Sequence, residues 1–243
     1  MVVSVRGVPR IAQVWHARGR ASKDLWCVRY DAWVNNEGHY FSPAPGSEVH
    51  ERDLMVEIDG VQRSLVTTKG LFSFDGLDKA TAILLNNAEM LPPIPEGARI
   101  VDVGCGWGPI ALTLALRHPS ATVTAVDVNP HARTITARNA ERLGLTNIRV
   151  AAPDEVDASD EFDALWSNPP IRIGKTALHE LLMRWLGQLA PGGTAALVVG
   201  KNLGSDSLAT WMQQQFPERT ISKAHSSKGF RLLTVDPLEN RAS

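Results

Sequence analysis

The tripeptide Asn168-Pro169-Pro170 places an amide side chain next to two residues that fix the backbone around it. It follows an apolar run at residues 162–166, which is typical of a buried strand. A proline has no N–H to donate to a sheet and holds its own φ at about −65°, so the strand must end abruptly in a rigid turn. The Asn168 amide oxygen and a free backbone carbonyl are then two acceptors that suit an exocyclic NH2 group.

A glycine-rich turn, Gly104-Cys105-Gly106-Trp107-Gly108, follows another apolar run at residues 99–103. Its glycines permit a tight turn and let backbone N–H groups approach a ligand at the N-terminus of the next helix. The dinucleotide fingerprint is G-x-G-x-x-G, whereas this turn has G-x-G-x-G and follows Asp102. A carboxylate there would repel a pyrophosphate but suits the cationic amino group of an amino-acid moiety. The turn therefore argues against a nicotinamide dehydrogenase.

Polar side chains stand at the ends of four successive predicted strands. Asp127 ends the strand after that of Asp102 and is placed to accept hydrogen bonds from ribose hydroxyls. Asp154 follows the third strand, in reach of an adenine amino group, and Asn168 follows the fourth. Simpler interpretations exist: Asp102 as the cap of a turn, Asp127 as a helix cap, and Asp154 as a surface acid. The shared position at the carboxyl ends of strands favours one ligand site.

These residues need a sheet of alternating strands and helices to bring them together. We expect strands over residues 99–103, 121–126, 148–152, 162–166 and 194–199, and helices over residues 109–117, 130–143, 176–189 and 205–216. Such alternation predicts right-handed βαβ units in a mostly parallel sheet with helices on both faces. Two final strands, at residues 220–224 and 230–235, flank a tight turn and should be antiparallel. The expected fold is α/β, with a Rossmann-like, seven-stranded sheet.

The first part of the chain has a different pattern, and we divide it into a β-rich extension at 1–69 and a main domain at 70–243 that begins with a lead-in helix over 78–90. Two strands are expected within residues 10–34, and a hairpin around Asp59-Gly60. Tryptophans in the first pair either pack the hairpin or stack on bases. Residues 1–30 hold six basic side chains and one acidic one, which is either a nucleic-acid contact or a solvated surface.

Length, charge and composition indicate an ordinary globular protein. The chain has 243 residues, a net charge of −1 and 44% hydrophobic residues, as in ordinary globular proteins. No run approaches the roughly 18 apolar residues of a membrane span, and the N-terminus lacks the pattern of a signal peptide. Cys27 and Cys105 are far apart and fit no metal spacing. We therefore expect a reduced, cytoplasmic setting, with neither a metal nor a membrane involved.

Together, these motifs resemble the class I S-adenosylmethionine-dependent methyltransferases, over about residues 70–236. A nearer similarity is to the small-subunit ribosomal RNA guanine-N2 methyltransferases, in the short layout of archaeal members; its markers are His39-Tyr40-Phe41-Ser42, Gly70-Leu71-Phe72-Ser73, Gly76-Leu77-Asp78-Lys79-Ala80-Thr81, Ser167-Asn168-Pro169-Pro170-Ile171-Arg172, Gly174-Lys175 and Lys228-Gly229-Phe230-Arg231. Longer members carry a degenerate copy of the methyltransferase domain ahead of the active one, which the residues before 90 are too few to form.

The resemblance implies a cofactor, a substrate and a role for each site residue. S-adenosylmethionine would contact the turn and the strand ends; those residues are Asp102, Gly104, Cys105, Gly106, Asp127, Val128, Asp154 and Asn168. Asn168 and the carbonyl of Pro169, held by Pro170, would accept hydrogen bonds from the target amine. Ile171 stands where many relatives have an aromatic residue, so Phe72 is a candidate to cover the base. Arg172 and Lys175 either contact phosphates or lie at the solvated surface.

The implied function is methylation of an exocyclic nucleobase amine, at guanine N2 of small-subunit ribosomal RNA, with RNA or the small subunit as the partner. One alternative is methylation of a glutamine side-chain amide in a protein, since that family also uses Asn-Pro-Pro. Members of that family usually have tyrosine where Ile171 stands, which counts against it. A second alternative is a non-catalytic module that binds the cofactor or RNA. The complete set of acids and the intact turn count against that alternative.

Overall fold

The computed structural model describes residues 51–68, 71 and 76–238, except for the side chain of Arg172. The expected strands within residues 10–34, the basic segment at 1–30 and Cys27 lie outside the described residues, as do Phe72 and the motif that begins at His39. The division of the chain at residues 69 and 70 stays a prediction, because both residues also lie outside them.

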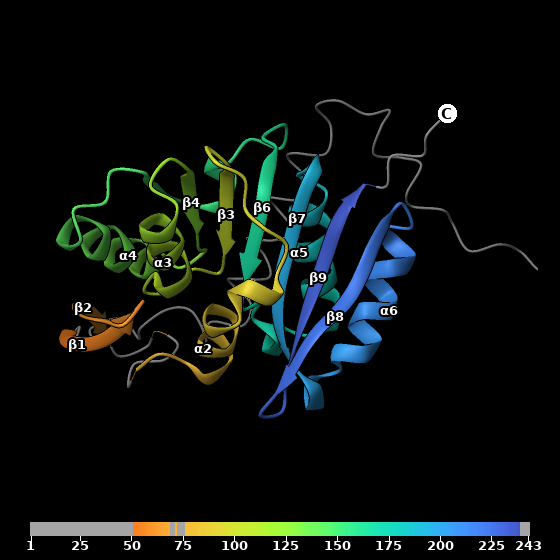
Figure 1. Ribbon diagram of the computed structural model, residues 1–243, viewed down its shortest axis with the longest axis horizontal. Coiled ribbons are helices and arrows are strands. Elements are labelled where there is room, and N and C mark those ends of the chain that lie inside the picture. Colours follow the sequence, from red (N-terminus) through yellow and green to blue (C-terminus); the bar gives the residue numbers. More distant parts are fainter. Residues whose placement is uncertain (1–50, 69–70, 72–75, 239–243) are drawn as a thin grey trace, which may run out of the picture. The chain divides into compact units, whose positions relative to one another are not determined.

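A seven-stranded sheet forms the centre of the described chain (Figure 1), in the order β5-β4-β3-β6-β7-β9-β8. Its strands are β3 (Arg99–Val103), β4 (Thr122–Val126), β5 (Ile148–Ala151), β6 (Phe162–Ser167), β7 (Leu189–Gly200), β8 (Arg219–Ser227) and β9 (Phe230–Leu238). β3 pairs in parallel with both β4 and β6, and β6 pairs in parallel with β7. β9 pairs antiparallel with β7 and with β8. The expected mixed sheet and its antiparallel final pair are confirmed.

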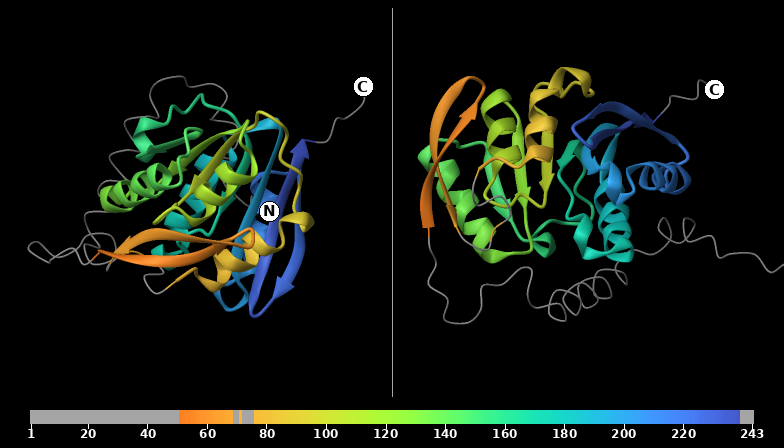
Figure 2. Two further views of the ribbon diagram at one scale, coloured as in Figure 1. Left: turned by 60° about the vertical axis from the view of Figure 1, so that its left-hand side comes forward. Right: turned by 90° about the horizontal axis from the view of Figure 1, so that it is seen from below.

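Helices cover both faces of this sheet, as Figures 1 and 2 show: α2 and α3 lie on one face and α5 on the other. The helices are α2 (Lys79–Asn86), α3 (Pro109–Arg117), α4 (Pro130–Arg142), α5 (Lys175–Leu186) and α6 (Ser205–Gln215), with 3-10 turns η2 (Ala88–Met90), η3 (Pro153–Glu155), η4 (Ile171–Ile173) and η5 (Lys201–Leu203). Buried side chains of α2 and α3 pack with those of β3, β4, β6 and β7 in one core cluster. This apolar packing holds the strand ends in place.

Two expected elements differ from the structure. The lead-in helix expected over 78–90 ends at Asn86, and η2 follows it. At this break the Asn87 side chain donates a hydrogen bond to the carbonyl of Ile83 (2.7 Å), which satisfies an acceptor at the helix end. The strand expected over 194–199, after the Pro191-Gly192-Gly193 sequence that is typical of a turn, is longer in the structure. It begins at Leu189 as β7, and the buried Arg219 donates hydrogen bonds to the carbonyls of Gly193 and Ala190 in this added part. A side chain distant in the sequence thus satisfies the backbone carbonyls of an irregular strand segment, whose local sequence predicts a turn.

The expected hairpin around Asp59 and Gly60 is confirmed as β1 (Glu51–Ile58) and β2 (Val61–Thr68). These two residues have φ values of 53° and 74°, the left-handed pair that a two-residue hairpin turn requires. The hairpin lies against α4 (Figure 2, right), and its apolar side chains join those of α3 and α4 in a second core cluster. Surface ion pairs join the same elements, among them Arg138–Glu51 and Arg142–Asp53.

A buried amide ties this hairpin to the glycine-rich turn. Asn139 of α4 is 0% exposed. Its Oδ1 accepts a hydrogen bond from Val66 N (2.7 Å), and its Nδ2 donates to the carbonyls of Val66 and Trp107 (2.9 Å each). Three hydrogen bonds from one side chain therefore bridge β2 and Trp107, the residue between Gly106 and Gly108.

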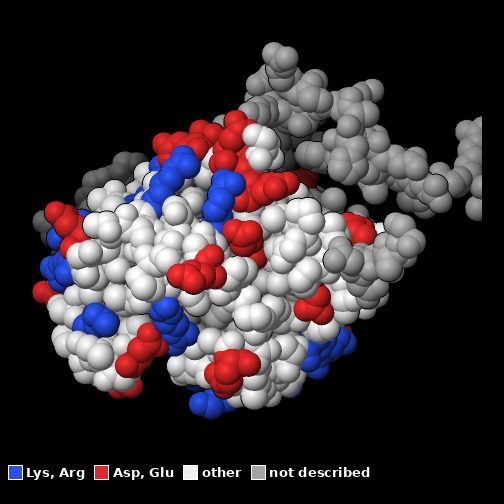
Figure 3. Space-filling view, turned by 45° about the horizontal axis from the view of Figure 1, so that its top comes forward, with Lys and Arg blue, Asp and Glu red and all other residues white. Residues whose placement is uncertain are grey.

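Acidic and basic side chains are interspersed on the face of the described chain that Figure 3 shows. Several charged side chains of the described residues form surface ion pairs, such as Arg99–Asp160, whose contribution to stability is on the order of 0–1 kcal/mol. The core clusters and buried hydrogen bonds therefore carry most of the stability. None of the helices in the described residues is long and apolar enough to cross a membrane.

Replacing Asn139 with alanine should destabilise the protein by about 3 kcal/mol, because three buried backbone groups lose their partner together. Urea denaturation, followed by circular dichroism, measures this change. The control is Arg138→Ala on the same helix, which breaks an exposed ion pair and should change the unfolding free energy by less than about 1 kcal/mol. Equal effects of the two substitutions would contradict the bridging role of Asn139.

Candidate active site

The order of the strands brings the predicted site residues to one edge of the sheet. β3 lies between β4 and β6, and all three run in parallel, so their carboxyl ends are neighbours. Asp102 lies in β3, Asp127 directly follows β4, and Asn168 directly follows β6. In open α/β sheets this edge is where ligands bind.

The turn after β3 depends on glycine at three positions. Gly104, Gly106 and Gly108 have φ values of 80°, 60° and 98°, which side chains with a Cβ rarely adopt. A Cβ on Gly108 would also lie 3.1 Å from side-chain atoms of Leu112 and Thr136. The N–H groups of Gly104 and Cys105 donate to the carbonyl of Val126 (2.8 and 3.0 Å), which joins this turn to the end of β4.

Asp102 is buried, and only one of its carboxylate oxygens has a partner. Its Oδ2 accepts a hydrogen bond from Ala111 N (3.0 Å) in the first turn of α3, so the proposed role as a cap accounts for that oxygen alone. Its Oδ1 has no partner among the described residues. The pKa of Asp102 is raised to about 8 as the net result of three causes: burial raises it most, the Ala111 N–H lowers it, and the charge of Asp127 raises it. A cation bound at the unpaired Oδ1 would favour the ionised carboxylate and lower this pKa.

The Asp127 carboxylate accepts hydrogen bonds from two turns, the glycine-rich turn and the turn that leads into α4. Its Oδ2 accepts from Gly106 N in the glycine-rich turn, and its Oδ1 accepts from Asn129 N (2.9 Å each). Asn129, and not Asp127, caps α4, because its side chain accepts from His131 N. Burial raises the pKa of Asp127, while hydrogen bonds from the backbone and the charge of Arg133 lower it. The carboxylate remains able to accept further hydrogen bonds.

The turn after β6 lies beside the glycine-rich turn. Ser167 donates from its hydroxyl to the carbonyl of Val103 (2.6 Å), which joins the last residues of β6 and β3. A Cβ built on Gly104 would lie 3.8 Å from the Cδ of Pro170, so the two turns are in van der Waals range. Ligand groups bound at the two turns would therefore lie next to each other.

The Asn168 side chain is oriented by its nitrogen. Its Nδ2 donates to Asp78 Oδ2 (3.0 Å) and to Thr81 Oγ1 (3.1 Å). Its Oδ1 accepts no hydrogen bond from any described residue and remains an available acceptor. The expectation of a free carbonyl at Pro169 is wrong, because this carbonyl accepts from Ile171 N (2.8 Å) within the tight turn. A carbonyl has two lone pairs, so a second hydrogen bond is still possible.

The other predicted site residues lie along the same edge. Asp154 is exposed in η3, directly after β5, and Ile171 is half-buried in η4. The backbone of Arg172 also lies in η4, and Lys175 is exposed at the start of α5. Val128 follows Asp127 and is half-buried, with its carbonyl bound by Arg133 (2.9 Å).

Cys105 is buried as expected, with its sulfur 3.7 Å from Thr136 Oγ1. Burial raises the pKa of its thiol, as do the charges of Asp127 and Asp102, so the thiol stays protonated and unreactive. No group of three or more described His, Cys, Asp or Glu side chains is arranged to hold a metal ion.

The prediction from sequence missed Thr136 and Ser167, which hold the two turns through hydroxyl groups, and the contacts of Asp78 and Thr81 with Asn168. Thr136 donates to the carbonyl of Gly106 (2.9 Å) from a helix thirty residues later. Such contacts leave no local signal. The capping role of Asp78 did have one, because an acid directly before a helical pattern is a standard N-cap.

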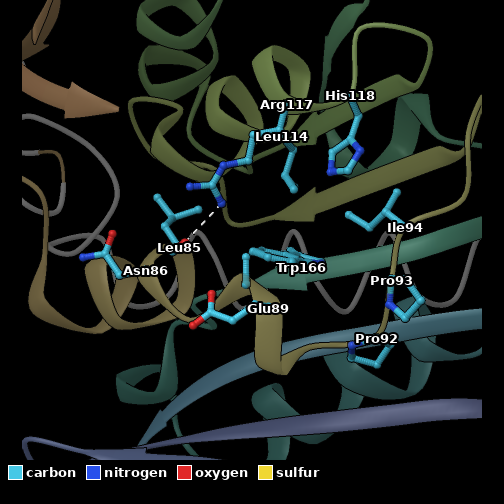
Figure 4. A pocket seen from close by; sticks show the side chains of 11 residues that line it. Leu85, Asn86, Glu89, Pro92, Pro93, Ile94, Leu114, Arg117, His118 and Trp166 are labelled. Carbon is cyan, nitrogen blue, oxygen red and sulfur yellow. Dashed lines mark hydrogen bonds between the residues drawn. The ribbon is translucent and has the colours of Figure 1, made fainter. Parts of the chain in front are cut away.

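A cavity of about 760 Å³ lies elsewhere, between α2, η2 and the end of α3 (Figure 4). Trp166 of β6 lies at its base, and Arg117 crosses one side to donate a hydrogen bond to the carbonyl of Leu85 (3.1 Å). Its lining includes none of the predicted site residues. The candidate active site is therefore defined by the strand ends and not by this cavity.

Similarities to known proteins agree with this geometry. Residues 62–234 match the family described as the methyltransferase small domain. The chain is 30% identical over 198 residues to the uncharacterised protein YbxB of Bacillus subtilis, covering 80% of this chain and 96% of that protein. It is 34% identical over 175 residues to ribosomal RNA small subunit methyltransferase C of Pseudomonas aeruginosa (strain LESB58), covering 70% of this chain and 50% of that protein. The chain spans about half the length of such curated relatives.

Solved structures share the fold. The 16S rRNA N2 G1207 methyltransferase RsmC of T. thermophilus, solved with AdoMet and guanosine, superposes with a TM-score of 0.65 at 22% identity, covering 81% of this chain and 53% of that one. TYW2 of M. jannaschii, solved with AdoMet, superposes with a TM-score of 0.53 at 15% identity, covering 78% and 87%.

A seven-stranded sheet with an antiparallel final pair, a glycine-rich turn after its first central strand and an acid after the next define a class I S-adenosylmethionine-dependent methyltransferase. The chain belongs to the methyltransferase small domain family.

The unfolding free energy should depend on pH through Asp102. The pKa of Asp102 is about 8 in the folded protein and 3.8 by its ordinary value, so the folded protein holds this proton more tightly than the unfolded chain does. The resulting stabilisation is fully present only below about pH 4. Stability should fall as pH rises from about 4 to about 8, by up to about 1.4 kcal/mol per pH unit. Urea denaturation of the ligand-free protein between pH 5 and 9 measures this slope.

Asp102→Asn is the matched control, because it keeps an acceptor for Ala111 N and cannot ionise. The difference in unfolding free energy between the two proteins should grow with pH and become constant above pH 8. Parallel curves for the two proteins would show that Asp102 does not titrate in this range.

Proposed function

We propose that this protein methylates the N2 amine of guanine in small-subunit ribosomal RNA. The observation that carries the proposal is that Asp78 and Thr81 bind the nitrogen of the Asn168 amide, which leaves its oxygen as the acceptor for a ligand. The turn that holds Asn168 also brings Pro170 close to Gly104 of the glycine-rich turn. Relatives named as ribosomal RNA small subunit methyltransferase C supply the substrate class. The structural relative solved with guanosine supports the choice of base.

The cofactor is proposed to lie along the ends of β3, β4 and β5. Asp102, with its unpaired Oδ1, fits the cationic amino group. Asp127 fits the ribose hydroxyls, with Val128 beside it, and Asp154 fits the adenine amino group. The backbone of Gly104, Cys105 and Gly106 is proposed to line the path between them. When bound, the cofactor would supply an electrophilic methyl group on a sulfonium.

The chain's own contribution is alignment of the amine. The lone pair of an aryl amine is delocalised into the ring, which makes it a poor nucleophile. Two fixed acceptors, Asn168 Oδ1 and the second lone pair of the Pro169 carbonyl, hold the two N–H bonds and favour a tetrahedral nitrogen. The lone pair is proposed to point toward a methyl donor at the glycine-rich turn, since Gly104 lies close to Pro170. The nitrogen becomes positively charged as it gains the methyl group and then loses one proton to water, so a strong base is not needed for this step.

The base must leave its stack to reach Asn168. Ile171, half-buried directly after the turn, is proposed to cover one face of the base without the ring stacking that an aromatic residue adds. Lys175, exposed at the start of α5, and Arg172 are proposed to contact phosphates. Phe72, outside the described residues, remains a candidate for the second face. A cytoplasmic location suits a ribosomal substrate.

Incubation with labelled S-adenosylmethionine should place label in small-subunit ribosomal RNA, and nucleoside analysis should find it at guanine N2. Small subunits, free RNA and proteins with exposed glutamine amides are tested in turn. Asn168→Ala should lower turnover at least a hundredfold, because the amine loses its fixed acceptor. The control Asn86→Ala, an exposed amide on α2, should leave turnover unchanged. Label only in protein would contradict the proposed substrate.

Cofactor binding can be tested separately by calorimetry with S-adenosylmethionine. Asp127→Ala should weaken binding at least tenfold, because two turns and the proposed ribose site lose one carboxylate. Asp160→Ala removes a half-buried acid that pairs with Arg99 at the start of β3, the opposite end of the strand from the glycine-rich turn, and serves as the control. Unchanged affinity in Asp127→Ala would refute its proposed role.

A further inference from the structure

A carboxamide can present either its oxygen or its nitrogen to a ligand, and the two differ by a half-turn of one torsion. With the oxygen toward the target amine, Asn168 accepts a hydrogen bond. With the nitrogen toward it, two donors would face the N–H groups of the amine. The backbone of the Asn-Pro-Pro turn is the same in both cases, so the prolines alone do not select the productive form. Another contact has to do so.

That contact comes from α2, ninety residues earlier in the chain. Asn168 Nδ2 lies 3.0 Å from Asp78 Oδ2 and 3.1 Å from Thr81 Oγ1. A carboxylate accepts hydrogen bonds and cannot donate them, so only the nitrogen of the amide is stable against Asp78. The half-turn that reverses the amide would place its oxygen against Asp78 Oδ2 with no proton between them, and the bond from Nδ2 to Asp78 would be lost. The Thr81 hydroxyl can accept or donate, so it supports the orientation that Asp78 selects.

Asp78 is itself fixed by the helix that it caps. Its Oδ2 accepts hydrogen bonds from Ala80 N (2.9 Å) and Thr81 N (3.2 Å), the free N–H groups at the start of α2. Thr81 is buried at 4% exposure, and α2 packs against β7 and α3 in the main core cluster. Both acceptors for Asn168 are therefore attached to a rigid element.

We propose that Asp78 and Thr81 are positioning residues that hold the Asn168 amide with its oxygen toward the target amine. The proposal rests on the proposed methyltransfer to an exocyclic amine, because only then does the direction of the amide matter for turnover. Neither residue contacts the substrate in this account. Each acts through Asn168.

Thr81→Val and Thr81→Ser form the sharpest pair. Valine keeps the branched shape and the backbone N–H that Asp78 caps, but it removes the hydroxyl. Serine keeps the hydroxyl. We expect Thr81→Val to lower kcat about fivefold with unchanged affinity for S-adenosylmethionine, and Thr81→Ser to retain the wild-type kcat within about twofold.

Asp78→Ala and Asp78→Asn form the second pair. Alanine removes the charged acceptor, and kcat should fall about tenfold to a hundredfold. Asparagine caps helices as well as aspartate does, and its oxygen can replace Oδ2 toward both the helix and Asn168. Rescue of kcat by Asp78→Asn separates the loss of the acceptor from the loss of the residue itself.

The orientation can be measured without any substrate, by NMR of the side-chain amide of Asn168. Its Nδ2 resonance is assigned as the signal that disappears in Asn168→Asp. The Nδ2 protons should exchange with solvent more slowly than those of the exposed Asn86, and the signal should move in Thr81→Val and in Asp78→Ala. It should keep its wild-type position in Asp78→Asn and Thr81→Ser.

The two readouts separate the possible failures. An amide signal that is unprotected, or that ignores both Thr81→Val and Asp78→Ala, overturns the positioning role, as does an unchanged kcat in both variants of an active enzyme. A wild-type protein that shows the protected signal but methylates no amine contradicts the proposed function and leaves the orientation of Asn168 by Asp78 and Thr81 established. Protection together with the expected losses of kcat supports both.

Discussion

The parallel pairing of β3 with β6 is the constraint on which the site depends. The Ser167 hydroxyl donates a hydrogen bond to the carbonyl of Val103 at the end of this strand pair. Just beyond it, Pro170 of one turn lies close to Gly104 of the other. One turn carries the glycine backbone and the other carries the amide acceptor. In the proposed function, strand register brings a methyl donor at the first turn and an amine at the second into line, before any side chain contacts a ligand.

Two elements that precede the glycine-rich turn in the chain, the β1–β2 hairpin and helix α2, hold the two turns in position. On one side, Asn139 ties the β1–β2 hairpin to Trp107, between two of the glycines. On the other side, the start of α2 binds the Asn168 amide through Asp78 and Thr81. The family match begins at residue 62, inside the hairpin, which is consistent with a functional unit that includes these elements.

Much of the fold was predictable because its signals are local. Alternating strands and helices, the glycines of the turn and the Asp59-Gly60 hairpin each follow from short-range patterns, and the structure confirms them. What could not be predicted depends on partners far apart in the chain. Residues 191–193 belong to strand β7, where the carbonyl of Gly193 accepts a hydrogen bond from the distant Arg219. The Pro169 carbonyl accepts a hydrogen bond within its own turn. The orientation of Asn168 depends on a residue ninety positions away, which no spacing rule indicates.

The central claim is that the two turns form one site for methyl transfer to an exocyclic amine. A crystal structure with S-adenosylhomocysteine and guanosine tests it most directly. The account predicts the guanine N2 at about 3 Å from Asn168 Oδ1, with its lone pair directed at the cofactor sulfur beside Gly104. A base bound away from Asn168, or an Asn168 oxygen turned toward Asp78, would contradict it.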